Sequence, residues 1–140
     1  MNILKILTGK RIVGNIGEDA ACSYLKKQKY KIKGRNYVAA GHEIDIIAEN
    51  REYVAFVEVK TRTAGHESIK ESRPAASVTP EKQRSIISAA RSYAASLNTN
   101  KKYRFDVAEV IISEEKEVLD INYIESAFTL TDAYAKHPHR

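Results

Sequence analysis

The segment HEIDIIA at residues 42–48, followed closely by YVAFVEVK at residues 53–60, decides the fold of this chain. The first segment partly alternates between apolar and polar residues. The second is rich in β-branched and aromatic residues, which is typical of strands. The four residues between them, 49–52, are polar, and such a short polar link favours a hairpin turn. The sequence therefore predicts two adjacent antiparallel strands.

Alternation along these two strands predicts which side chains share a face. Successive residues of a strand point to opposite sides, so Asp45 lies on the same face as Glu43 and Ile47. On the second strand, Glu58 and Lys60 share a face for the same reason. The opposite face of the first strand is then formed by its remaining apolar residues, Ile44, Ile46 and Ala48.

The turn sets which residues stand opposite one another. A turn centred on residues 50–51 pairs Asp45 with Phe56 and Glu43 with Glu58. Asp45 and Glu58 are then diagonal neighbours, roughly 7–8 Å apart at the backbone. Two carboxylates at that separation can converge on one divalent cation, and hard cations such as Mg²⁺ or Mn²⁺ take carboxylate oxygens.

These residues fit phosphodiester hydrolysis. A bound Mg²⁺ polarises the scissile phosphate and lowers the pKa of a bound water. Lys60, two residues beyond Glu58, can position the attacking water or stabilise the developing negative charge. The spacing Asp-x(12)-Glu-x-Lys has low specificity, however, and the same side chains also fit cross-strand ion pairs on a solvated face.

Two helices add candidate residues. The first is predicted over residues 16–29, with Asn15 as its N-cap, and Glu18 lies on the stripe that faces the sheet. Glu18 is either a further ligand of the metal or water, or the acid of a capping box. The second helix is predicted to begin at Thr79, with Pro80 in its first turn. Lys82 near its start either reaches a phosphate or extends along the surface.

Residues 61–78 are mostly polar and predict a long loop that leaves the strand ending at Lys60. Arg62, Lys70 and Arg73 in this loop are either contacts to a nucleic-acid backbone or solvated charges. Further strands are predicted over residues 33–38, 104–112 and 118–124, with Arg104 and Asp106 as a structural ion pair. Residues 130–140 are predicted to form a loose tail.

The bulk composition limits the protein class. The 140 residues fit one domain, with residues 1–13 allowed to be flexible. Lys and Arg number 23 against 18 Asp and Glu, and a net charge of +5 favours a polyanion partner. The single cysteine, Cys22, excludes a disulfide framework and suits a reducing compartment. The sequence contains no apolar run long enough for a signal peptide or a membrane helix, which predicts a cytoplasmic location without membrane association.

Taken together, a set of motifs resembles the YraN family of small bacterial proteins over residues 14–128. That family is similar to the PD-(D/E)XK superfamily of restriction-endonuclease-like nucleases, which includes Holliday junction resolvases. Two departures are His42 before Glu43, where the family has Gly, and Ile44 at the position of the superfamily's Pro. The motifs that carry the resemblance are Gly17-Glu18, Ala21, Tyr24-Leu25, Arg35-Asn36-Tyr37, residues 43–48 and 56–62, Lys82, Arg104-Phe105-Asp106 and Ala127-Phe128.

The resemblance implies an α/β fold of the restriction-endonuclease-like type, with a central mixed β-sheet flanked by helices. It implies Asp45 and Glu58 as metal ligands, Lys60 as the catalytic lysine and Glu18 as an accessory acid. The expected function is a metal-dependent endonuclease that hydrolyses structured or branched DNA, for which a homodimer would be suitable. The alternative is a non-catalytic module that retains the fold and binds nucleic acid or protein.

Overall fold

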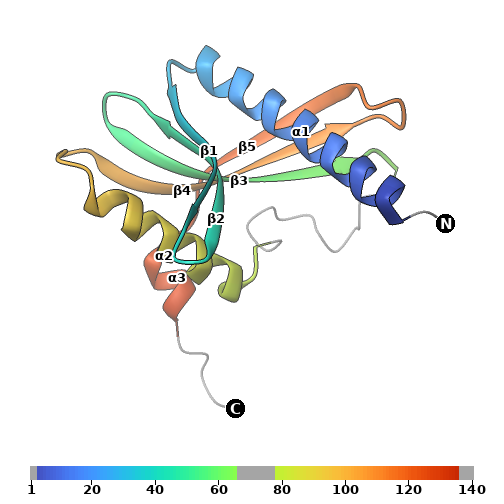
Figure 1. The fold of residues 1–140 in the computed structure, drawn as a ribbon. Helices are drawn as coiled ribbons and strands as arrows, with labels where there is room; N and C mark the ends of the chain where they lie inside the picture. The colour runs from blue at the N-terminus through green and yellow to red at the C-terminus, as the bar shows by residue number, and fades with distance from the viewer. Residues whose placement is uncertain (1–2, 66–77, 136–140) are drawn as a thin grey trace.

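A central five-stranded sheet organises the protein in the computed structural model, which describes residues 3–65 and 78–135 (Figure 1). The strands follow one another in the order β1-β2-β3-β4-β5. Helix α1 covers one face, and α2 and α3 lie on the other, which confirms the predicted α/β class with a mixed sheet flanked by helices. The elements are α1 (Ile3–Lys27), β1 (Lys31–Ala39), β2 (His42–Glu49), β3 (Tyr53–Thr63), α2 (Pro80–Ala95), β4 (Lys102–Ile112), β5 (Val118–Phe128) and α3 (Leu130–Tyr134).

Within the sheet of the described residues, only one neighbouring pair of strands is parallel. β3 and β4 pair in parallel from Tyr53 opposite Lys102 to Thr63 opposite Ile112, and the other neighbours are antiparallel. Parallel strands need a crossover connection, which here contains α2. The crossover leaves from the end of β3, the strand that carries Glu58 and Lys60.

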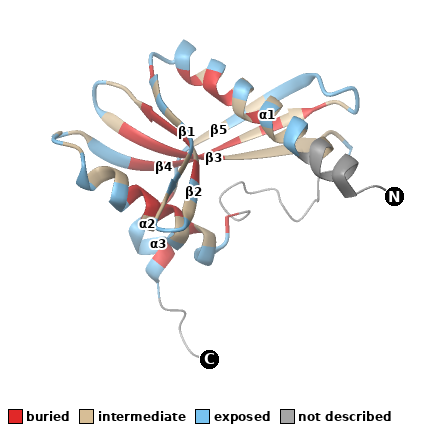
Figure 2. Ribbon diagram, viewed as in Figure 1, coloured by how far each residue is buried: buried red, intermediate tan, exposed pale blue. Residues whose placement is uncertain are grey.

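Two apolar clusters hold the layers together, one on each face of the sheet. Under α1, Leu25 packs with Ile46 and Val57. Under α2 and α3, Phe56 packs with Ile87 and other apolar side chains. Buried residues accordingly lie along the sheet and on the helix sides that face it, and the outer helix surfaces are exposed (Figure 2). Alternation along β3 therefore assigns each of its residues to a layer.

The second helix begins as predicted. The Thr79 side chain accepts a hydrogen bond of 3.1 Å from the Lys82 amide, and Pro80 lies in the first turn. The first helix differs: α1 begins at Ile3, so Asn15 lies inside the helix and the predicted cap is wrong. Glu18 is consequently in the middle of α1, where a capping-box role is excluded. Local capping signals do not identify a helix start when the preceding residues also favour helix.

Other boundaries differ by a few residues or more. β3 continues three residues past Lys60 into the segment predicted as a loop, and β1 and β5 are longer than expected. Within the predicted tail, Leu130–Tyr134 forms α3, whose first turn has a capping box formed by Thr129 and Asp132. Sequence interpretation missed this short helix.

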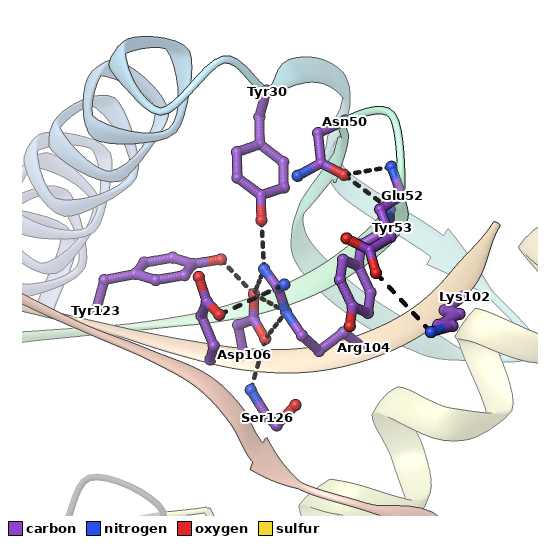
Figure 3. Close-up of polar contacts among 10 residues, drawn as sticks. Tyr30, Asn50, Glu52, Tyr53, Lys102, Arg104, Asp106, Tyr123 and Ser126 are labelled. Atoms are coloured by element: carbon purple, nitrogen blue, oxygen red, sulfur yellow. Dashed lines mark hydrogen bonds and ion pairs between the residues drawn. The ribbon is translucent and has the colours of Figure 1, made fainter.

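The predicted hairpin register is wrong by two residues. Ile47 stands opposite Phe56, and Ile46 opposite Val57, because the turn is centred between Arg51 and Glu52. The Asn50 side chain fixes this turn by accepting hydrogen bonds from the amides of Glu52, at 2.9 Å, and Tyr53, at 2.7 Å (Figure 3). A shift of two residues keeps every side chain on its predicted face of β3.

The predicted alternation along β2 fails at one place. Ile46 and Ala48 pack under α1 as a pair, but Ile44 packs with Ile47 under α2. Opposite this break, Asn36 of β1 has a left-handed backbone conformation with φ 51°, between the paired residues Arg35 and Tyr37. The β1–β2 hairpin thus bends toward α2 (Figure 1). There the Tyr37 and Tyr93 rings meet edge to face at 5.3 Å. Asp45 lies at the bend.

Candidate active site at the β2–β3 fork

Asp45 occupies the point where β2 and β3 separate. Backbone pairing between the two strands ends at Ile46 opposite Val57. One residue further on, the Asp45 side chain replaces a backbone carbonyl as the hydrogen-bond acceptor. Its Oδ2 accepts a hydrogen bond of 2.8 Å from the Val59 amide. The carboxylate is therefore held against β3 by the backbone itself, and its position does not depend on a flexible side-chain partner.

The surroundings of Asp45 disfavour its charged form. Burial raises its pKa to about 7, and the neighbouring Glu58 carboxylate adds to this rise. The Val59 amide and the Lys82 ammonium act in the opposite direction but do not compensate. A raised pKa on a carboxyl beside a second carboxyl indicates two acids forced together in a weakly solvated place.

Glu58 is the second acid of the pair, and it is poorly satisfied. It is only 8% exposed, and its Oε2 is buried without a hydrogen-bond partner. Among the described residues, the nearest cation is the Lys82 ammonium of α2, whose Nζ lies 3.8 Å from that oxygen, too far for a hydrogen bond. An oxygen buried in this way costs free energy unless another group binds it.

Lys60 lies two residues beyond Glu58 on β3 and is half-buried. Phe56 of the same strand packs under α2, while Val57 packs under α1. By alternation, Glu58 and Lys60 belong to the α2 side. The predicted shared face of Glu58 and Lys60 is thus consistent with the packing, and Lys82 approaches that same side from α2.

Glu18 reaches the fork from the other layer. α1 approaches β3 so closely at Gly17 that an added Cβ would lie 1.8 Å from Thr61 Oγ1, which explains a glycine there. Burial raises the pKa of Glu18, and the charge of Asp45 raises it further. The Arg35 guanidinium lies 3.5 Å from Glu18 Oε1 and forms a 2.8 Å ion pair with Asp19. Glu18 is electrostatically linked to Asp45 but is held by Arg35.

Within the described residues, no group of three acids, histidines or cysteines is arranged to hold a metal ion. The protein contribution to a cation site at the fork is therefore the pair Asp45 and Glu58. Glu43 is exposed and pairs with Val38 of β1, and His42 pairs with Ala39, so both lie beyond the point where β2 and β3 separate.

The residues predicted to contact nucleic acid differ in their distance from the two acids. Lys82 lies at the fork, beside Glu58. Arg62 belongs to β3 rather than to a loop, and its Nε lies 3.5 Å from Glu109 Oε2 of β4. Lys70 and Arg73 lie outside the described residues. Of the four predicted contact residues, Lys82 alone is therefore placed beside the two acids by the described structure.

Comparison with protein families matches a family model over residues 17–110, which span the fork from Gly17 to Val110. The model is that of the uncharacterised protein family UPF0102. The chain belongs to this family, the YraN family to which its motifs pointed.

Curated UPF0102 relatives are similar over nearly their whole length. The protein from Caldicellulosiruptor saccharolyticus is 42% identical, with 85% of this chain and 98% of the relative covered. Those from Chlorobium phaeobacteroides and Chloroherpeton thalassium are each 39% identical, covering 84% and 89% of this chain and 93% and 95% of the relatives. Their names state the family and no activity. Family membership therefore identifies no reaction for this chain.

Three features of this UPF0102 site were not predicted from the sequence. The Val59 amide that holds Asp45 is a backbone group and has no sequence signal. Arg35 was noticed in a motif but was given no role, although its ion pairs hold Glu18 and Asp19. Gly17 belongs to the same set of motifs and was also given no role, although a glycine within a predicted helix is itself a signal of close packing.

Two further predictions concern the rest of the chain. Cys22 of α1 is a buried, free cysteine. None of the helices in the described part of the chain is long and apolar enough to cross a membrane.

Proposed function

We propose that this UPF0102 protein is a divalent-metal-dependent nuclease that hydrolyses phosphodiester bonds, with structured or branched DNA as its substrate. The observation that carries the proposal is the pair of carboxylates at the fork. Asp45 and Glu58 are close enough for Glu58 to raise the pKa of Asp45, and Glu58 Oε2 is buried without a hydrogen-bond partner. Two such acids destabilise the fold unless a cation joins them.

The donor set fits Mg²⁺ or Mn²⁺. Mg²⁺ is usually bound in proteins by one or two carboxylates, and the remaining positions go to water and to substrate phosphate oxygens. Asp45 and Glu58 supply those two carboxylates, and the absence of a third protein ligand among the described residues leaves room for the phosphate. When bound, the metal would polarise the phosphate and lower the pKa of a water.

The lysines supply the remaining parts. Lys60 follows Glu58 on the same side of β3, where its ammonium would orient a water for attack or stabilise the negative charge that develops on the phosphate. Lys82 pairs loosely with Glu58 at 3.8 Å. Once the Glu58 charge is neutralised by the cation, Lys82 is free to bind a non-bridging phosphate oxygen.

Glu18 would act at the edge of this arrangement. The charge of Asp45 raises the pKa of its carboxyl group, and Arg35 holds the side chain on the α1 side. Its role would be to hold a water near the acids rather than to replace either of them as a ligand. Because the Asp45 carboxylate accepts a hydrogen bond from the Val59 amide, it would already be oriented before any substrate binds.

The experiment is a nuclease assay on linear, nicked, flapped and four-way DNA with Mg²⁺ or Mn²⁺. The variants are Asp45→Asn, which can still accept the hydrogen bond from Val59, and Lys60→Ala. Glu115→Gln, at an exposed acid in the β4–β5 turn, is the matched control. We expect metal-dependent cleavage in wild type and Glu115→Gln, with a loss of about 10²-fold or more in the other two.

Cleavage that persists in Asp45→Asn would contradict the proposal, because that cleavage would come from another site or a contaminant. DNA binding without cleavage, unchanged in both variants, would instead support a non-catalytic module that retains the fold. Comparing the four DNA forms identifies the preferred substrate, and equal rates on all of them would contradict the preference for branched DNA.

A further inference from the structure

A hollow lined by cations lies at the end of the sheet where α1 ends, β1 begins and β2 turns into β3. It has a volume of about 340 Å³. Two further hollows share Arg51 with it, and both of these also include Glu52 in their lining. Its charged lining residues are Lys29, Lys31, Lys33, Arg51, Lys101 and Glu49.

Within the part of the chain that the structure describes, most of these cations have no acidic partner. Lys101 forms an ion pair with Glu49, the only acid in the lining. Among the described residues, Lys29, Lys31, Lys33 and Arg51 form no ion pair. Like charges gathered around one concave surface repel each other and raise the local potential for anions. The hollow is thus strongly cationic at one end of a protein whose net charge is only +5.

The local backbone holds these side chains at the hollow. Ile32 packs under α1, so Lys31 and Lys33 on either side of it point to the opposite, exposed face. Lys29, just after α1, has a left-handed conformation with φ 72°, and the next amide, that of Tyr30, donates to the Leu25 carbonyl at 3.0 Å. Glycine or asparagine is usual at this position after a helix, so a lysine here is conformationally unfavourable.

The hollow is too far from the fork to hold the same phosphate. Five residues of β3 separate Glu58 from Tyr53 at the turn, which is roughly 17 Å at about 3.3 Å per residue. At about 3.4 Å per step along one strand, this spans roughly five base pairs. A nucleic acid whose reacting phosphate lies at the fork would therefore present other phosphates near the hollow.

We infer that the hollow around Lys29 and Arg51 is a second contact surface for a nucleic-acid phosphate backbone, separate from the site at Asp45 and Glu58. Lysine ammonium groups on flexible stems neutralise phosphates without reading bases, so the contact adds affinity and orientation but no sequence preference. The inference rests on the proposed function in one respect, namely that the polyanion is a nucleic acid.

The test measures binding of labelled linear and four-way DNA at several salt concentrations, in EDTA so that no cleavage occurs. The test variant combines Lys29→Gly with Arg51→Gln. The control combines Lys116→Gly with Arg91→Gln, which also removes two positive charges and also replaces a lysine with positive φ, 68°, in the turn at the far end of the sheet. A third protein, Lys33→Gln with Arg51→Gln, guards against an effect of the backbone at residue 29.

We expect the slope of log K against log salt to fall by about 1.8 for the test variants, because each phosphate contact contributes about 0.9. The control should keep the wild-type slope. Equal slopes in wild type, test and control would overturn the inference, and so would an equal loss in test and control. A reduced slope in a protein that cuts nothing would still support the contact surface while the nuclease proposal fails. An unchanged slope with Asp45-dependent cleavage would support the nuclease proposal and contradict the contact surface.

Discussion

The Asp45 carboxylate accepts a 2.8 Å hydrogen bond from the Val59 amide, at the place where backbone pairing between β2 and β3 has ended. A side chain thus takes the position of the next backbone carbonyl in the ladder. One carboxylate oxygen accepts from the Val59 amide, and the side chain also interacts with the neighbouring Glu58 carboxyl. Replacing Asp45 with Asn keeps an acceptor for Val59 and removes only the charge.

Asp45→Asn should change how stability depends on pH in the absence of metal. Between the ordinary pKa of 3.8 and about 7, the folded carboxyl keeps a proton that the unfolded chain has released. The contribution of Asp45 to wild-type stability must therefore fall as pH rises through this window. We expect the two proteins to be equally stable near pH 4, and the Asp45→Asn variant to be more stable by on the order of 4 kcal/mol at pH 8. Urea unfolding at several pH values measures this.

The matched control for that titration is Glu115→Gln, which removes an exposed acid far from the fork. Its stability relative to wild type should not grow over the same window. A difference between wild type and Asp45→Asn that stays constant from pH 4 to pH 8 would mean that Asp45 is not in the weakly solvated pair described above.

Divalent cations should stabilise the wild-type fold. Binding to the folded state alone adds about 2.7 kcal/mol when the free metal is at 100 times its Kd. We expect Mg²⁺ or Mn²⁺ to raise the thermal midpoint of wild type and of Glu115→Gln, but not of Asp45→Asn or Glu58→Gln. Differential scanning fluorimetry with Ca²⁺-free buffers measures it. Equal shifts in all four proteins would place the bound cation elsewhere.

The sequence was sufficient to predict the face of each β3 residue but not its partner across the hairpin. Strand patterns have a period of two, so Glu58 and Lys60 stay together whichever even shift the turn imposes. The turn itself depends on Asn50 accepting from two amides, which moves the pairing of Ile47 from Val54 to Phe56. Asp45 and Glu58 are neighbours in the structure, as predicted. The hairpin register from which this was predicted was nevertheless wrong by two residues.

Other parts of the site depend on tertiary packing and could not be found from local patterns. Ile44 turns to the α2 side because β1 and β2 bend at Asn36, which is a property of the hairpin as a whole. The position of Glu18 depends on how closely α1 approaches Thr61. Helix α2, by contrast, carried its own start signals in Thr79 and Pro80, and it was predicted to the residue at that end.

Gly17→Ala should destabilise the protein although alanine favours helix. The added Cβ would lie 1.8 Å from Thr61 Oγ1 and 3.1 Å from its Cβ, so α1 must shift away from β3. We expect a loss of about 1–3 kcal/mol, together with weaker metal stabilisation because Glu18 moves with the helix. Adding Thr61→Ala removes the nearest atom and should restore part of the loss, as a double-mutant cycle would show.

Gly14→Ala is the control for this packing contact, because no atom lies within 4 Å of a Cβ added there and the residue is in the same helix. Here helix propensity alone acts, and stability should rise by about 0.5–1 kcal/mol. If the two alanine variants behave alike, the close approach of α1 to β3 is absent in solution.

The buried pair of Arg104 and Asp106 should contribute to folding and not to DNA cleavage. Asp106 is fully buried, and its Oδ2 accepts hydrogen bonds from the Arg104 guanidinium at 2.9 Å and from the Tyr123 hydroxyl at 2.6 Å (Figure 3). The Arg104 guanidinium also contacts the Tyr30 hydroxyl and lies 4.5 Å from the centre of the Tyr53 ring. The cluster joins β4 to β5 and to the segment that follows α1.

Removing one partner leaves the other buried without compensation. We expect Tyr123→Phe to lose about 1–2 kcal/mol and Asp106→Asn to lose about 3–5 kcal/mol in urea unfolding. Tyr103→Phe, at an exposed tyrosine on the same strand as Asp106, should change little. Per folded molecule, cleavage by Tyr123→Phe should equal that of wild type. A variant that stays folded but no longer cuts would place this cluster in the active site, because a purely structural hydrogen bond has no other way to affect the rate.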